Sequence, residues 1–164
     1  MSVAIKQTAH AFRVSLSDTI NVPSPNNIFR SGFITSFGTN FFTRNGVNGL
    51  FITNNVQPND IVYNTSLATA ALVTSVPSET QVNLNADIFT AASQGFIIFK
   101  APQNGGIIEF PTLYISSAIT TLRVLTAGGE DVTFDNPPFG PFPMKVSRVF
   151  LTGTTAGPRI LALT

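Results

Sequence analysis

Short hydrophobic segments that alternate with polar residues run along the whole chain. Residues 81–88 are the clearest case, because every second side chain in them is apolar. Residues 131–135 repeat this alternation, with Val132 and Phe134 on the apolar side. Both patterns predict strands with one buried face. Only residues 86–94 carry a helical pattern, and this segment is too short to form a stable helix alone.

Glycine, proline and asparagine interrupt these segments at intervals typical of β-sandwiches and barrels. Asn45-Gly46 is a strong turn signal, and Ala127-Gly128-Gly129 predicts a hairpin loop. Residues 136–143 include four prolines, which lack a backbone donor, so we expect an extended connector instead of a regular strand. We expect Phe139 and Phe142 of this connector to fold onto apolar surface. The fold class predicted is all-β, an antiparallel β-sandwich or barrel.

Turns with the sequences Asn-Gly and Asn-Gly-Gly bracket the middle of the chain. One organisation that explains both turns is a small β module, residues 38–105, inserted into a loop of another domain. The flanking β-sandwich would then combine residues 1–37 with residues 106–164. The alternative is one continuous β domain over residues 1–164, and the pattern does not decide between the two.

The chain ends with a glycine- and threonine-rich turn, residues 152–158, followed by an apolar strand. A phosphate-binding loop would need a Lys-Ser or Lys-Thr pair and a following helix, and neither is present. The terminal strand is apolar on both faces of its pleat, with Ile160 on one and Leu161 and Leu163 on the other. Such a strand needs cover on both sides, from its own domain or from a neighbouring subunit.

Charge is scarce throughout the sequence. Only 10% of the residues are charged, against about 25% in a typical soluble domain. The net charge is +1 and the basic residues form no cluster, which argues against a nucleic-acid-binding surface. Polarity comes from 20 Thr, 13 Ser and 14 Asn, which would keep an ordinary β domain soluble. The alternative, which we favour, is that other subunits cover much of the surface, because interface cores are depleted in charge.

The residues available for catalysis are few. The chain has one histidine, His10, no cysteine and no G-x-S-x-G motif, so neither a zinc site nor a typical serine nucleophile is expected. Asp131 and Asp135 would lie about 13 Å apart on one strand, too far for a catalytic carboxylate pair. We therefore expect these carboxylates to be solvated charges, and we assign no catalytic or metal-binding residue. The sequence has no signal-peptide pattern and no apolar run that would span a membrane.

Two segments near the C-terminus resemble a known family. TLRVLTAGGEDVTF (121–134) and KVSRVFLTGTTA (145–156), followed by an apolar strand, resemble a small β module of tailed-phage virion proteins. The module is similar to the spike-base domains of phage and phage-like particles, which often carry a T-G-T-T-A turn before an apolar C-terminus. Residues 17–23 look like the start of the same module. Other stretches that resemble small β modules of phage structural proteins are residues 56–64, 73–76 and 84–89.

This resemblance implies a non-enzymatic virion component without a cofactor. The function we expect is that of a cement, decoration or spike-base subunit on the capsid exterior, which stabilises the shell through repeated contacts with the major capsid protein or other virion proteins. Because such proteins usually sit on local threefold axes, the resemblance makes a homotrimer one expectation.

Two alternatives remain open. One is a tail, neck or fibre-adaptor protein of the virion. The other is a carbohydrate-binding module for receptor recognition, although the chain has no Trp and its only tyrosines are Tyr63 and Tyr114.

We expect subunit contacts at the edge strands of the two termini and at the proline-rich segment. The residues predicted for this interface are Val3, Ile5, Phe139, Phe142, Ile160, Leu161 and Leu163.

Overall fold

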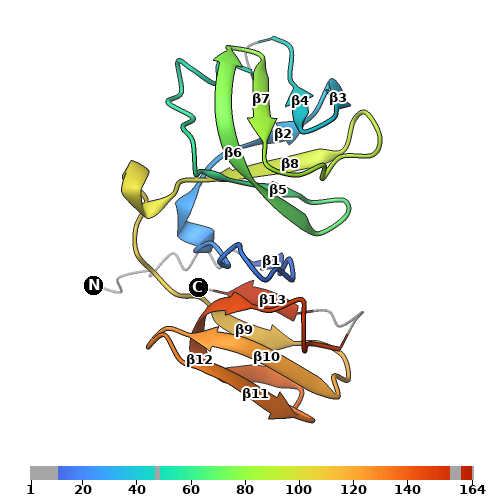
Figure 1. The fold of residues 1–164 in the computed structure, drawn as a ribbon, viewed down its shortest axis with the longest axis vertical. Coiled ribbons are helices and arrows are strands. Elements are labelled where there is room, and N and C mark those ends of the chain that lie inside the picture. The colour runs from blue at the N-terminus through green and yellow to red at the C-terminus, as the bar shows by residue number, and fades with distance from the viewer. Residues whose placement is uncertain (1–10, 47–48, 156–159, 164) are drawn as a thin grey trace, which may run out of the picture.

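Two antiparallel sheets pack against one another to form the protein (Figure 1). The computed structural model describes residues 11–46, 49–155 and 160–163. Neither sheet closes into a barrel, so the prediction of an all-β, sandwich-like fold is confirmed. Within the described residues the helical elements are two single 3₁₀ turns, Pro25–Asn27 and Pro102–Asn104.

The described residues from both ends of the chain form a six-stranded sheet. Its spatial order is β1-β13-β9-β12-β10-β11, and every pair in it is antiparallel. The strands are β1 (Ala11–Arg13), β9 (Thr112–Ile115), β10 (Thr121–Thr126), β11 (Asp131–Asp135), β12 (Gly140–Val149) and β13 (Ile160–Leu163).

The middle of the chain forms a seven-stranded sheet with the order β2-β8-β5-β6-β7-β4-β3. Its two edge strands, β2 and β3, follow one another in sequence but are not paired with each other. The strands are β2 (Ile28–Phe33), β3 (Ser36–Gly38), β4 (Phe41–Thr43), β5 (Ile61–Asn64), β6 (Thr69–Ser78), β7 (Gln81–Leu84) and β8 (Gly95–Phe99).

The seven-stranded sheet begins earlier in the chain than the boundary predicted at residue 38. Strand β2 pairs with β8, and β3 pairs with β4, so both belong with the middle segment and not with the N-terminal flank. The strand ladder therefore places residues 28–99 in one sheet. Whether the two sheets are separate domains stays a prediction.

Strands β5 and β8 are apolar on both faces, and this joins the two sheets. Val62, Phe96 and Ile98 point into a core within the seven-stranded sheet. Tyr63 and Phe99, on the opposite face of the same strands, belong to the core that includes the six-stranded sheet. The alternation of strand side chains thus divides one apolar run between two cores.

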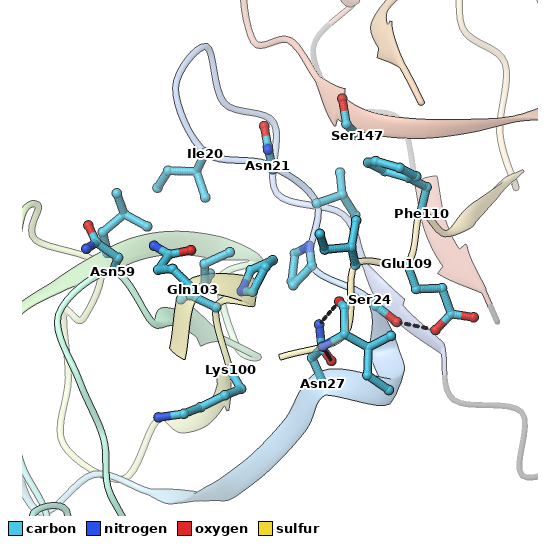
Figure 2. A pocket seen from close by; sticks show the side chains of 18 of the residues that line it. Ile20, Asn21, Ser24, Asn27, Asn59, Lys100, Gln103, Glu109, Phe110 and Ser147 are labelled. Carbon is cyan, nitrogen blue, oxygen red and sulfur yellow. Dashed lines mark hydrogen bonds between the residues drawn. The ribbon is translucent and has the colours of Figure 1, made fainter. Parts of the chain in front are cut away.

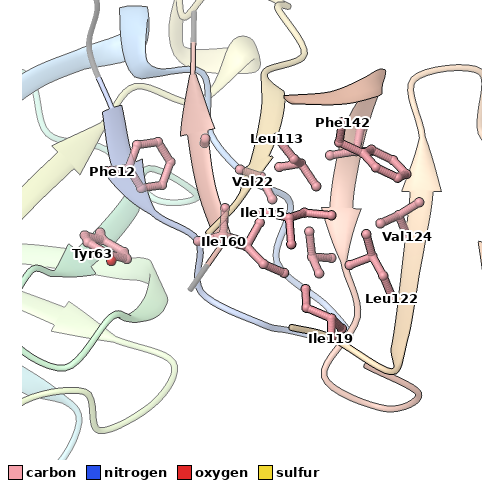
Figure 3. Packing of buried hydrophobic residues seen from close by; sticks show 14 of the residues in the cluster. Phe12, Val22, Tyr63, Leu113, Ile115, Ile119, Leu122, Val124, Phe142 and Ile160 are labelled. Carbon is pink, nitrogen blue, oxygen red and sulfur yellow. The ribbon is translucent and has the colours of Figure 1, made fainter. Parts of the chain in front are cut away.

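Phe12 of β1 makes the central contact between the sheets (Figure 3). Its ring centroid lies 5.4 Å from that of Tyr63 in an edge-to-face arrangement, and 5.0 Å from that of Phe99. Leu113, Leu122 and other side chains of the six-stranded sheet continue the same core. The aromatic cluster therefore fixes how the sheets meet.

The C-terminal strand is an interior strand, which corrects our prediction that it lies at an edge. Strand β13 is hydrogen-bonded to β1 on one side and to β9 on the other. Ile160 and Ala162 are buried in the core, while Leu161 and Leu163 are half-buried. The edges of this sheet are β1 and β11, because the N-terminal strand adds beside the C-terminal one.

The proline-rich segment also differs from the prediction in part. Pro141 and Pro143 lie inside strand β12, where we expected a connector. The register between β12 and β9 shifts between Pro141 and Lys145, and β10 pairs only with the later part of β12. The prolines are tolerated because the ladder is irregular where their backbone donors are missing.

Residues 86–94 form no helix, in agreement with the expectation that this segment is too short for one. Strand β7 ends at Leu84, and residues 85–94 form an irregular loop with one turn at residues 92–93. The Gln94 side-chain oxygen accepts a hydrogen bond from the Thr90 backbone N–H at 2.9 Å. Local side-chain bonding of this kind replaces the helical ladder.

We expect Tyr63→Phe to raise the free energy of unfolding by about 1 kcal/mol, because a buried hydroxyl without a partner is unfavourable. Tyr63 is 2% exposed, its hydroxyl has no hydrogen-bond partner among the described residues, and burial raises its pKa to about 12. Urea unfolding would measure the change, with Tyr114→Phe at a more exposed position as the control. A loss of stability in Tyr63→Phe alone would contradict this expectation.

Candidate functional site

Two connectors join the sheets, residues 14–27 and residues 100–111, and a pocket lies where they meet (Figure 2). Its volume is about 240 Å³. Strands β5, β6 and β12 contribute one lining residue each, so both sheets reach the pocket. The lining residues are Thr19, Ile20, Asn21, Val22, Pro23, Ser24, Asn27, Asn59, Ile61, Leu72, Lys100, Ala101, Pro102, Gln103, Ile107, Ile108, Glu109, Phe110 and Ser147.

The buried carboxylate of Asp60 anchors the start of the second connector. Its Oδ2 accepts hydrogen bonds from Lys100 Nζ at 3.0 Å and from the Gln57 backbone N–H at 2.9 Å. Its Oδ1 accepts from the Ala101 backbone N–H at 3.0 Å and from Asn104 Nδ2 at 2.8 Å. The Asp60 side chain is fully buried, so these four donors replace its hydration.

A second polar contact holds the backbone of Ile107. The side chain of Asn27, which is 8% exposed, donates from Nδ2 to the Ile107 carbonyl at 2.8 Å. Its Oδ1 accepts from the Ile107 N–H, also at 2.8 Å. The backbone of Ile107 is therefore fixed, although the side chains of Ile107 and Ile108 are 60% and 74% exposed.

Glu109 ties the second connector to the first. Its carboxylate accepts hydrogen bonds from Ser24 Oγ at 2.8 Å and Asn26 Nδ2 at 2.7 Å, and Figure 2 shows the bond to Ser24. The Ser24 hydroxyl oxygen also accepts from the Asn26 backbone N–H and so caps the first 3₁₀ turn. The bond from Ser24, and then that from Asn26, lowers the pKa of Glu109.

Nearly all of the residues that line the pocket are uncharged. Of the described residues that line it, Lys100 and Glu109 carry charge, and both are bound to partners within the chain. Val22 and Ala101 are buried and give the pocket an apolar wall, while Gln103 is exposed. This lining suits an uncharged group with an apolar surface.

The residues predicted for subunit contacts do not come together at this pocket. Ile160 is 1% and Phe142 3% exposed, so both belong to the protein's own core. Phe142 packs edge-to-face on Phe134 with ring centroids 5.0 Å apart. We predicted that Phe139 would fold onto apolar surface, and this is wrong, because its side chain is 67% exposed. Val3 and Ile5 lie outside the described residues, as does His10.

Ile107 and Ile108 were not among the contact residues predicted from the sequence. Their signal is a pair of isoleucines immediately after Gly105-Gly106, in a segment without strand alternation. An apolar pair in such a segment cannot be assigned to a buried face by periodicity, and the anchors that leave it exposed come from distant residues.

The threonine-rich turn near the C-terminus has a structural role in the described part, residues 152–155. Thr154 Oγ1 accepts a hydrogen bond from the Arg123 backbone N–H at 3.1 Å, and Thr155 Oγ1 accepts from the Thr121 backbone N–H at 3.0 Å. Gly153 has a φ of +93°, which favours glycine at this bend. The turn is therefore fastened to β10 by its threonines.

The other residues considered for chemistry have ordinary surroundings. Asp131 binds Arg123 with a 2.6 Å ion pair on the surface, and Asp135 is exposed. The described residues contain no group of three or more His, Cys, Asp or Glu placed to hold a metal ion. None of the helical turns in the described residues has the length and hydrophobicity needed to span a bilayer.

Comparison of this chain with family models, with curated proteins and with solved structures finds no match.

We expect Asp60→Asn to lower the free energy of unfolding by about 3 kcal/mol or more, because it leaves the Lys100 ammonium without its counter-charge in a nearly buried position. The NH₂ group of the new asparagine would also face groups that donate hydrogen bonds to Asp60 in the native chain. Chemical denaturation would measure the loss. Asp135→Asn is the matched control, since its carboxylate is exposed and should change stability by less than about 0.5 kcal/mol. Equal effects in the two variants would contradict the anchoring role of Asp60.

We expect Glu109→Gln to be less stable than the native chain at neutral pH and equally stable in acid. Because the folded-state pKa of Glu109 is lowered, its stabilising contribution is present above the ordinary pKa and is lost as the pH falls through the lowered value. The difference in melting temperature between the two proteins should therefore shrink below about pH 4. A difference that stays constant through this range would show that the carboxylate charge is not involved.

Proposed function

We propose that this chain is a non-enzymatic structural subunit of a phage virion, bound to the capsid exterior as a cement, decoration or spike-base protein. The observation that carries the proposal is the amount of apolar surface left uncovered on a charge-poor chain. Among the described residues, six large apolar side chains are more than half exposed: Phe33, Ile52, Ile107, Ile108, Phe139 and Leu151.

These side chains are distributed over the molecule. Phe33 ends an edge strand of the seven-stranded sheet, Ile108 lies on a connector, and Phe139 precedes a strand of the six-stranded sheet. A single binding site would gather such residues in one place. A subunit that contacts several neighbours, as in a repeated shell, would cover side chains distributed in this way.

The mechanism that follows is stabilisation by many modest contacts. Burial of a fully exposed large apolar side chain contributes roughly 1.5–3 kcal/mol, so each of these partly exposed side chains would contribute a fraction of that when a neighbour covers it. Identical copies repeat this contribution around the particle, and linked contacts strengthen one another without any single tight site. The major capsid protein and further copies of this chain are the partners that the proposal names.

The structure favours this role over carbohydrate binding. Tyr63 is buried between the sheets, so one of the two tyrosines available to stack on a sugar is inaccessible. Tyr114 is 37% exposed, on strand β9. A tail, neck or fibre-adaptor role would use the same exposed apolar groups, and copy number separates it from a capsid role.

We expect mass spectrometry of purified particles, made by the phage whose genome encodes this chain, to detect the protein at a copy number close to that of the major capsid protein. A few copies per particle would indicate the neck or tail instead. A particle preparation that contains the known structural proteins but lacks this chain would refute the proposal.

A further inference from the structure

Asn-Gly pairs are the places in this chain where a backbone nitrogen can attack a side chain. The sequence contains three of them, Asn45-Gly46, Asn48-Gly49 and Asn104-Gly105. Glycine has no Cβ, so its nitrogen can approach the side-chain amide of the preceding asparagine closely. This attack is the first step of deamidation. In a folded protein it requires that hydrogen bonds leave both reacting groups free.

The reacting groups of Asn45 and Gly46 are unrestrained. Both residues are exposed in the segment that follows strand β4. Among the described residues, the Asn45 side-chain amide has no hydrogen-bond partner and the Gly46 backbone N–H has no acceptor. Gly46 has a φ of +77°, and the space that a Cβ would occupy is open. The structure therefore leaves both groups of this pair free to react.

The same two residue types at Asn104-Gly105 are restrained at both groups. Asn104 Nδ2 donates hydrogen bonds to the Pro58 carbonyl at 2.9 Å and to Oδ1 of the buried Asp60 at 2.8 Å. The Gly105 backbone N–H donates to the Pro102 carbonyl at 3.1 Å. Attack at this pair would have to break these bonds first, and one of them is to a charged acceptor. The structure therefore protects Asn104.

The glycine nitrogen of the third pair is also engaged. Asn48 lies outside the described residues, but Gly49 is buried and its backbone N–H donates to the Gly46 carbonyl at 2.9 Å. Of the three glycine nitrogens, that of Gly46 is the one without an acceptor among the described residues. Hydrogen bonding thus separates pairs that the sequence makes equivalent.

We propose that Asn45 is a site of spontaneous deamidation in the folded protein. The Gly46 nitrogen attacks Asn45 Cγ and forms a cyclic succinimide. The Cγ–Nδ2 bond breaks, and Nδ2 leaves as ammonia with the proton that the Gly46 nitrogen loses. A solvent water molecule then opens the ring. Hydrolysis at Cγ gives aspartate, and hydrolysis at the main-chain carbonyl carbon gives isoaspartate.

Both products change this segment of the chain. The new carboxylate adds one negative charge, so the net charge of +1 becomes zero. Isoaspartate also adds a carbon to the main chain between two bonded groups, the Asn45 N–H, which donates to Thr35 Oγ1 at 3.0 Å, and the Gly46 carbonyl. The inference goes beyond the proposed function and does not rest on it, because the reaction needs only this chain and water.

The first experiment compares two of the pairs within one molecule. The native chain is incubated in mildly alkaline buffer and digested with trypsin, which leaves Asn45 and Asn104 in separate peptides, residues 45–100 and 101–123. Fragment-ion mass spectrometry distinguishes Asn45 from Asn48 in the first peptide. We expect Asn45 to deamidate at least about tenfold faster than Asn104, because Asn104 must first lose its hydrogen bonds.

Unfolding the chain separates the effect of the structure from that of the sequence. In concentrated urea the hydrogen bonds of Asn104 are lost, so we expect Asn45 and Asn104 to deamidate at similar rates. Asn45 that reacts no faster than Asn104 in the folded chain overturns the proposal. A difference of the same size in urea overturns it too, because the hydrogen bonds would then not be its cause.

Two variants identify the product. Asn45→Asp carries the new charge, so the acidic species that accumulates in the native sample should elute with it on ion exchange. Asn45→Gln keeps an amide but disfavours closure of the ring, so we expect this species to form at least about tenfold more slowly. Thermal unfolding monitored by circular dichroism would confirm that both variants fold. An acidic species that forms equally fast in Asn45→Gln overturns the proposal.

Discussion

Burial of strands β5 and β8 on both faces is the constraint on which the rest of the structure depends. Val62 and Ile98 face one core, and Tyr63 and Phe99 face the other, so a single pair of strands is shared by two hydrophobic clusters. Each face excludes water only if a sheet covers it. The six-stranded sheet, through Phe12, covers the second face, and the two connectors must then cross between the sheets.

Polar groups refine the arrangement that apolar packing sets. Asp60 and Asn27 are buried side chains whose hydrogen bonds hold the second connector, and the anchors leave Ile107 and Ile108 facing solvent. Buried polar groups require partners with defined geometry, so they specify a position more narrowly than hydrophobic contacts do. The pocket and its exposed rim follow from these few bonds, and for this reason the candidate site lies between the sheets.

Several elements could be predicted from local pattern, and others could not. The alternation in residues 131–135 and the Ala127-Gly128-Gly129 turn predicted a hairpin that the structure contains, because both signals are local. The terminal strand was predicted as apolar on both faces, but its interior position depends on β1, which lies far away in sequence. The helical pattern at residues 86–94 was too short to predict a helix, and in the structure this loop is held by a side-chain bond from the Thr90 N–H to Gln94.

By itself, the sequence determined the fold class, the low charge and the scarcity of catalytic side chains, since these are properties of composition and short-range periodicity. Only the tertiary structure decided which apolar residues remain exposed. Phe142 and Ile160, predicted as contact residues, are buried, whereas Ile107 and Ile108 are not. The exposure of a side chain depends on which residues pack over it, and these can be far away in the sequence. Asn27, which holds the backbone of Ile107, is an example. The strand period shows which residues share a face, and the packing of the sheets determines which faces are covered.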